Sequence, residues 1–264
     1  MTFAEALAAL EPREARILLA HVTGLAEASV LAHPERLLEG EPLARFLELA
    51  ARRARGEPVA YLVGEKEFYG LRLRVDASVL IPRPETELLV ELALARRPGS
   101  VLDLGTGSGA IALALKRHLP AARVIAVEAS PAALAIACGN ARRLGLEVEF
   151  RQGAWFEPVA GERVDLVVSN PPYVAVGDPH LAEGDLRFEP RAALVAGEDG
   201  LDAIRTIIAG ARAHLTRGGW LLLEHGLGQD EAVRRLMGEA GLEDIATWPD
   251  LSGIARVSGG SIKS

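Results

Sequence analysis

The chain has 264 residues, of which 49% are hydrophobic, and this is ample for the core of one large domain or of a domain with a smaller partner. Asp and Glu total 36 against 29 Lys and Arg, and the net charge of −7 argues against a dedicated nucleic-acid binder, because phosphate contacts need a basic surface. The single cysteine, Cys138, excludes an internal disulfide and a cysteine-based zinc site, so we expect a protein of the reducing cytoplasm. No apolar run is long enough to cross a bilayer and the first residues do not form a targeting signal, so we expect no membrane role.

Residues 1–57 have the pattern of short amphipathic helices. Pro12, Gly24 and Pro34 interrupt the apolar periodicity, and a Gly-Glu-Pro break at residues 40–42 precedes the last helix. No motif in this part indicates chemistry, so we expect a small helical domain that docks a substrate.

Residues 58–84 are predicted to form a β-hairpin linker. Two apolar stretches, residues 60–64 and 68–75, are separated by turn residues and favour two short strands. A helix is then expected to begin near Pro84, a residue that suits the first helical turn.

Residues 85–264 alternate between strand and helix patterns, which predicts an α/β domain with a doubly wound, seven-stranded, Rossmann-like sheet. The strands are expected at residues 101–104, 123–128, 147–151, 164–169, 219–225, 242–248 and 254–258, and the helices at about 109–119, 131–144, 200–216 and 229–240. A long irregular segment, residues 174–200, is typical of a lid or binding loop. The roles of Asp178 and Glu189 within it stay open.

Glycines follow the first strand of this domain and open a helix. Gly105, Gly107 and Gly109 allow backbone amides at the helix N-terminus to approach a ligand, and with Ala110 the loop also satisfies a loose dinucleotide-binding pattern. A nicotinamide enzyme is therefore the first alternative. Asp103 disfavours it, because a carboxylate just before the glycines repels a pyrophosphate and suits a cationic ligand.

Two further strand ends extend this ligand prediction. Glu128 ends the second strand, where a carboxylate accepts hydrogen bonds from ribose hydroxyls. Trp155 follows the third strand, where an adenine ring would lie. A nucleoside with a cationic tail fits these positions, and S-adenosylmethionine fits better than NAD.

The fourth strand ends abruptly in Asn170-Pro171-Pro172-Tyr173. Two successive prolines cannot continue a sheet, so Asn170 is expected at the carboxyl edge, where open α/β sheets bind ligands. A stiff rim of this kind can grip a planar amide or amino group. Asn170 Oδ1 and the Pro171 carbonyl would each accept one N–H bond, and Tyr173 would pack on the amide plane.

In order and spacing, these motifs resemble the bacterial protein-(glutamine-N5) methyltransferases that modify peptide chain release factors, the HemK/PrmC family. The resemblance covers nearly the whole chain and rests on residues 105–109, Glu128, 152–156, 170–173, 187–190 and 222–226. The sequence departs from the usual pattern at Glu128 and Ala154, where the family more often has Asp.

The resemblance implies a helical substrate-docking domain (1–57), a β-hairpin linker (58–84) and an S-adenosylmethionine-dependent methyltransferase domain (85–264). It implies a monomer that methylates the glutamine of the Gly-Gly-Gln motif in class 1 release factors, without a metal and without direct nucleic-acid contact. The residues expected to bind S-adenosylmethionine are Asp103, Gly105, Thr106, Gly107, Ser108, Gly109, Glu128, Trp155 and Asn170. The residues expected at the reacting amide are Asn170, Pro171, Pro172 and Tyr173.

Two other functions stay open at this point. An adenine-N6 nucleic-acid methyltransferase would use the same Asn-Pro-Pro-Tyr rim, although it needs a basic surface that this acidic chain lacks. A noncatalytic nucleotide-binding module of the translation apparatus would not need the rim at all.

Overall fold

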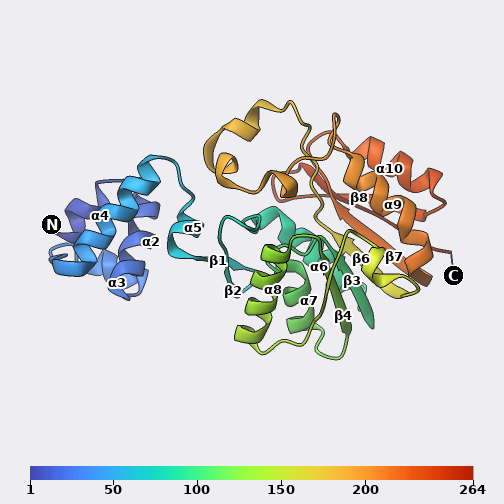
Figure 1. The fold of residues 1–264 in the computed structure, drawn as a ribbon, viewed down its shortest axis with the longest axis horizontal. Helices are drawn as coiled ribbons and strands as arrows, with labels where there is room; N and C mark the ends of the chain where they lie inside the picture. Colours follow the sequence, from blue (N-terminus) through green and yellow to red (C-terminus); the bar gives the residue numbers. More distant parts are fainter. Residues whose placement is uncertain (264) are drawn as a thin grey trace. The chain divides into compact units, whose positions relative to one another are not determined.

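The structure is a computed structural model that describes residues 1–263. The chain divides into two compact units (Figure 1). The first comprises residues 1–65 together with residues 180–188, and the second comprises residues 66–179 together with the chain from Glu189 onward. None of the helices within residues 1–263 is both long and apolar enough to span a membrane.

The first unit is helical. It contains α1 (Phe3–Leu7), α2 (Pro12–Thr23), α3 (Glu27–Ala32), α4 (Gly40–Ala54) and α5 (Val59–Val63). Local sequence sets the helix ends: Thr2 and Glu5 form a capping box at α1, and Gly24 ends α2 with a left-handed φ of 69°. Phe3 and Phe46 belong to the unit's core of fully buried apolar side chains.

A distant part of the sequence belongs to this helical unit. Residues 180–188, which contain most of the 3₁₀ turn η3 (Pro179–Ala182) and all of η4 (Gly184–Phe188), contact the end of α4. Arg53 donates to Asp185 at 2.9 Å and to both carboxylate oxygens of Glu14 at 2.7 and 2.8 Å. The chain therefore leaves the second unit after Pro179 and re-enters it at Glu189.

The predicted strand over residues 60–64 is wrong, because this stretch forms α5. Pro58 caps the helix, Gly64 ends it with φ 74°, and Leu62 packs into the helical core. The hairpin lies further along, in β1 (Glu65–Phe68) and β2 (Leu71–Arg74). Tyr69 and Gly70 between these strands both have positive φ, as a type I′ turn requires.

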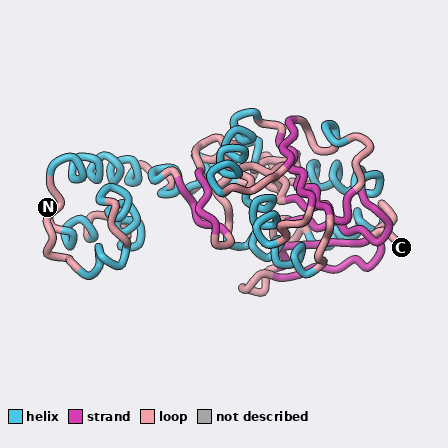
Figure 2. The backbone as a smooth tube through the Cα atoms, turned by 90° about the horizontal axis from the view of Figure 1, so that it is seen from below, coloured by secondary structure: helices cyan, strands magenta, loops and turns pink. Residues whose placement is uncertain are grey.

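The second unit is built on one seven-stranded sheet of order β5-β4-β3-β6-β7-β9-β8, which confirms the doubly wound prediction. The strands are β3 (Ser100–Leu104), β4 (Arg123–Glu128), β5 (Glu149–Gln152), β6 (Val164–Ser169), β7 (Leu215–Glu224), β8 (Glu243–Pro249) and β9 (Ala255–Ser261). In this sheet β9 is antiparallel to both of its neighbours, and the other neighbouring strands are parallel to each other. Figure 2 shows the sheet between helices on its two sides.

The helices of this unit cover both faces of the sheet. They are α6 (Glu87–Ala95), α7 (Ala110–His118), α8 (Pro131–Leu144), α9 (Asp202–His214) and α10 (Asp230–Glu239), with the 3₁₀ turns η1 (Pro84–Thr86), η2 (Glu157–Val159) and η5 (Arg191–Ala193). Val101 packs with α6, α7 and α8, whereas its neighbour Leu102 packs with α9 and α10, as the two-residue period of a strand requires. Strands β3 and β6 are adjacent, and the chain continues from them toward opposite edges of the sheet. The crevice beyond their carboxyl ends is the topological switch point, the position where such sheets bind ligands.

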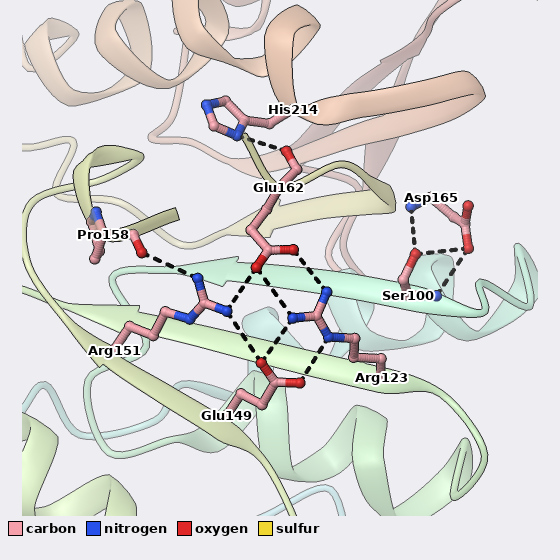
Figure 3. A network of polar contacts seen from close by, with 8 residues as sticks. All are labelled: Ser100, Arg123, Glu149, Arg151, Pro158, Glu162, Asp165 and His214. Atoms are coloured by element: carbon pink, nitrogen blue, oxygen red, sulfur yellow. Dashed lines mark hydrogen bonds and ion pairs between the residues drawn. The ribbon is translucent and has the colours of Figure 1, made fainter. Parts of the chain in front are cut away.

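A network of ion pairs ties the edge strand β5 to β4 and to the loop after η2 (Figure 3). Arg123 bonds Glu149 at 2.7 Å and Glu162 at 2.8 Å, and Arg151 bonds the same two carboxylates at 3.3 and 2.8 Å. The two arginines hold the pKa of Glu162 down to about 2. A lowered carboxyl pKa stabilises the fold above the ordinary value of 4.5, and this contribution disappears as the pH falls toward 2.

We therefore expect the melting temperature of the protein to fall more steeply between pH 4.5 and 2 than that of Glu162→Gln. Scanning calorimetry measures both. Glu239→Gln is the control, because among the described residues Glu239 pairs only with the exposed Arg235, at 3.8 Å. If the melting temperature fell equally steeply with pH in the unmodified protein and in Glu162→Gln, the network would not stabilise the fold.

Candidate active site

A cavity of about 300 Å³ lies at the switch point, entirely within the second unit. Its wall combines the loops that follow β3, β4, β5 and β6 with two covering segments, residues 78–86 and 190–193. The volume is at the lower end of the range for sites that hold drug-sized ligands.

The structure brings most of the predicted site residues together in this wall. Those that line the cavity are Gly105, Thr106, Gly107, Ser108, Glu128, Trp155, Asn170 and Pro172. Asp103, Gly109, Pro171 and Tyr173 lie outside the wall.

The loop after β3 owes its shape to glycine. Gly107 has φ 56°, a conformation that L side chains rarely adopt, and the space beside it is open. Gly109 is the N-cap residue of α7, and a Cβ there would approach Leu113 to 3.0 Å. At Gly105 and Gly107, which line the cavity, no side chain therefore covers the backbone of the loop.

Glu128 holds this loop in place. One carboxylate oxygen accepts from the Gly107 amide and the other from the Ser130 amide, each at 2.9 Å. Each oxygen of a carboxylate has two acceptor positions, so one on each oxygen is left for a ligand with two adjacent hydroxyls.

Asp103 lies beneath the loop and is fully buried. Its Oδ2 accepts from the Thr106 hydroxyl at 2.6 Å and from the Ala112 amide at 3.2 Å, while its Oδ1 has no hydrogen-bond partner. Burial raises the pKa of Asp103 to about 7. A buried carboxylate oxygen without a partner next to the wall fits a ligand that brings a donor or a positive charge.

The loop after β5 contributes Gly153, Ala154 and Trp155 to the wall. Trp155 has a positive φ of 48°, and a Cβ on Gly105 would lie 3.5 Å from its ring. Phe156 points elsewhere and stacks on His214, with ring centroids 4.5 Å apart. Of the two aromatic residues, only Trp155 faces the cavity.

Asn170 and Tyr173 have different surroundings. Asn170 Nδ2 donates to the Thr86 hydroxyl at 3.1 Å, at the cavity wall. The Tyr173 hydroxyl instead donates to Glu224 at 3.2 Å, and its backbone carbonyl accepts from Gln229 at 3.0 Å. The structure therefore does not place the Tyr173 ring in the wall beside Asn170.

The covering segments include Thr86, which sequence reasoning missed, and they are joined by Glu189, whose role the sequence left open. Glu189, whose carboxylate is buried, accepts from the Ile81 amide at 3.1 Å and forms an ion pair with Arg83. This fixes segment 190–193 against segment 78–86. The signal available in the sequence was an acidic residue between Phe188 and Pro190, an apolar setting that favours a paired carboxylate. Within residues 1–263, no group of three or more His, Cys, Asp or Glu side chains is arranged to hold a metal ion.

Two domain families match the chain. The family described as PrmC N-terminal domain matches residues 2–64, and the family described as Methyltransferase small domain matches residues 84–183. Among solved structures, a methyltransferase from Pyrococcus furiosus has a TM-score of 0.59 at 17% identity, covering 84% of this chain and 98% of that one. That likeness shows a shared fold.

Full-length relatives are more specific. A release factor glutamine methyltransferase from Burkholderia pseudomallei is 51% identical over 274 residues, which cover 99% of this chain and 96% of that protein. One from Vibrio cholerae serotype O1 is 48% identical over 256 residues, covering 95% and 90% respectively. The chain belongs to the family of release factor glutamine methyltransferases.

Proposed function

We propose that this protein transfers a methyl group from S-adenosylmethionine to the side-chain amide nitrogen of the glutamine in the Gly-Gly-Gln motif of class 1 release factors. One observation carries the proposal: the Asn170 amide lines the same cavity as Glu128 and the glycine loop. An amide-gripping residue and a nucleoside-binding wall thus share one site.

The residues of the wall fit the methyl donor. Glu128 keeps acceptor positions for two ribose hydroxyls, and Trp155 offers a ring beside the adenine position. The Oδ1 atom of Asp103, buried and without a partner, suits the cationic amino-acid end, directly or through a water molecule. When bound, S-adenosylmethionine supplies an electrophilic methyl group on its sulfonium.

The chemistry then depends on positioning. An amide nitrogen is a poor nucleophile because its lone pair is delocalised, so the site must hold it at the methyl group in the right orientation. Asn170 Oδ1 and the Pro171 carbonyl would accept the two N–H bonds and aim the nitrogen. Held in this way, the nitrogen would take the methyl group and lose one N–H proton to water, and the sulfonium of the donor would become a neutral thioether. No step in this sequence calls for a metal ion.

The helical domain (1–57) is proposed to select the acceptor. The cell contains many other proteins with glutamine side chains. A second contact surface raises the effective concentration of the release factor at the active site. Translation termination is cytoplasmic in bacteria, so this is the compartment that the proposal implies.

The wall at Ala154 offers a test of the donor position. In Ala154→Asp, a carboxylate at the cavity wall would accept from the adenine amino group, and we expect binding about fivefold tighter, the effect of one net hydrogen bond of about 1 kcal/mol. Calorimetry with S-adenosylmethionine measures this. Ala154→Leu is the control, because it fills similar space without an acceptor. Unchanged binding in Ala154→Asp would mean that the adenine amino group does not lie at this loop.

The proposed function is tested with labelled methyl donor and four acceptors: an intact release factor, the same factor with Ala at its Gly-Gly-Gln glutamine, a short Gly-Gly-Gln peptide, and adenine-containing DNA. We expect label in the intact factor, less in the peptide, and none in the other two. Label in DNA would support the adenine-N6 alternative, and no transfer to any acceptor would support the noncatalytic one.

A further inference from the structure

The Asn-Pro-Pro-Tyr segment is anchored on both sides of its prolines. On one side, the buried hydroxyl of Ser169 donates to the last carbonyl of β3 at 2.6 Å. On the other side, the Tyr173 carbonyl accepts from the side-chain amide of Gln229 at 3.0 Å. Only Asn170 and the two prolines lie between these anchors, and proline restricts the backbone further. The position of the Tyr173 carbonyl therefore helps to set where Asn170 lies.

Gln229 uses both ends of its amide group. It is the half-buried N-cap residue of α10. Its Oε1 accepts from the Gly226 amide at 2.8 Å, and its Nε2 donates to the carbonyls of Tyr173 at 3.0 Å and Asp199 at 3.4 Å. A carbonyl only accepts and a backbone amide only donates, so these partners fix which end of the Gln229 amide faces each of them. The side chain thus joins the loop after β7, the end of the Asn-Pro-Pro-Tyr segment and the end of the long loop 174–200.

Directly after Tyr173, the chain pairs with the cover of the cavity. The Val174 amide donates to the Leu194 carbonyl at 2.8 Å, and the Val174 carbonyl accepts from the Ala196 amide at 3.0 Å. These two bonds belong to a short parallel bridge. Leu194 follows directly on the covering segment 190–193, which lines the cavity. Whatever holds Tyr173 therefore also helps to hold this cover.

Glycines leave room for the contact between Gln229 and Tyr173. A Cβ on Gly200, which has φ 75°, would lie 2.3 Å from the Tyr173 oxygen and 2.9 Å from Gln229 Nε2. A Cβ on Gly226 would lie 3.0 Å from Gln229 Oε1 and 3.3 Å from Tyr173 Cδ2. A carbon atom cannot approach a backbone oxygen to 2.3 Å, so a side chain at residue 200 would displace either the carbonyl or the amide that holds it.

We propose that Gln229 is a positioning residue for methyl transfer. By holding the Tyr173 carbonyl, it keeps Asn170 and the covering segment 190–193 in the arrangement that presents the acceptor amide to the methyl donor. The inference rests on the proposed function, because only an acceptor held at Asn170 needs this arrangement. Gln229 does not line the cavity, so it acts without touching either ligand. The donor wall is formed mainly by the loops after β3, β4 and β5, so donor binding should depend little on Gln229.

The first test is Gln229→Glu, which keeps the shape of the side chain and an acceptor for Gly226. As a carboxylate it has no donor for the Tyr173 carbonyl. We expect kcat on the release factor to fall about tenfold, because the loss of one orienting hydrogen bond lets the reacting groups shift. The donor Kd is expected to change less than about twofold. Single-turnover kinetics with saturating donor and calorimetry measure the two quantities.

Gln229→Met is the uncharged companion variant. It removes the amide at similar size and adds no negative charge, and we expect a similar fall in kcat with the donor Kd again kept. A fall in Gln229→Glu alone would mean that the added charge, and not the lost hydrogen bond, disturbs the site.

Gly200→Ala and Gly253→Ala form a matched pair that tests the same carbonyl from another direction. The two glycines have similar left-handed φ values, 75° and 79°, so both substitutions strain the backbone and both should lower the melting temperature. Only at Gly200 does the added methyl group meet the Tyr173 carbonyl, whereas the space beside Gly253 is open. We therefore expect kcat to fall about tenfold or more in Gly200→Ala and to stay unchanged in Gly253→Ala.

Unchanged kcat in folded Gln229→Glu, or an equal loss of kcat in Gly200→Ala and Gly253→Ala, would overturn the proposal. So would a donor Kd that weakens as much as kcat falls, because Gln229 would then support the whole site and not the acceptor side. If the Gln229 variants do not fold, the glycine pair decides, and unchanged kcat in Gly200→Ala overturns it. Failure of the proposed function looks different, because the unmodified protein would then transfer no methyl group to the factor.

Discussion

Replacing Asn170 by alanine is expected to lower the rate of methyl transfer by about 10²- to 10³-fold, the effect of removing one preorganised group at a reacting centre. Asn170 lines the cavity, and within residues 1–263 its side-chain amide forms a hydrogen bond only with Thr86, so little of the fold depends on it. The melting temperature and the donor affinity should therefore change little. Single-turnover kinetics with saturating donor separates the chemical step from binding.

Asp165→Asn is the matched control, since it changes a polar side chain at the other end of the same strand. Asp165 accepts from Gly99, Ser100 and Thr216, far from the cavity wall. We expect this variant to lose stability and keep its turnover. Near wild-type turnover in Asn170→Ala would mean that Asn170 only ends the strand.

Glu128→Ala is expected to weaken S-adenosylmethionine binding by about 10²-fold or more. Two hydrogen bonds from ribose hydroxyls to a charged acceptor contribute about 1.5 to 3 kcal/mol each, and the glycine loop also loses its anchor at Gly107. Isothermal calorimetry gives the affinity directly.

Glu128→Asp serves as the conservative variant, because it keeps the carboxylate on a side chain shorter by one methylene group. We expect it to recover most of the lost affinity. If Glu128→Ala bound the donor as tightly as the unmodified protein, the ribose would have to lie elsewhere in the cavity.

Much of the second unit was predictable because its strands are short apolar runs that end in turn residues. Residues 123–128 and 164–169 match β4 and β6 at both ends, and the helix at 131–144 matches α8. The strand order then brings the glycine loop and Asn170 to one crevice, as the parallel topology requires.

The failures share a physical cause. Residues 60–64 are too few for periodicity to separate a helix from a strand, and packing of Leu62 into the helical core decided the matter. The direction in which a side chain points also depends on tertiary contacts. The Tyr173 hydroxyl donates to Glu224, which lies 51 residues further along the chain, and no local sequence pattern predicts that hydrogen bond.

Thr86 was hidden for the same reason. In the sequence it follows Pro84 and Glu85 and suggests an ordinary helix start, whereas its hydroxyl accepts from Asn170, which lies 84 residues further along the chain. The motifs of the sequence therefore located the residues proposed to meet the ligands. The residues that hold them in place became visible only in the folded chain.

The most direct test of methyl transfer to the release factor is to incubate the factor with this protein and S-adenosylmethionine. Fragment mass spectrometry then locates the methyl group. We expect one added methyl group on the side-chain nitrogen of the Gly-Gly-Gln glutamine, and none when Asn170→Ala replaces the unmodified protein. A methyl group on any other residue of the factor, or an unmodified factor, would contradict this expectation.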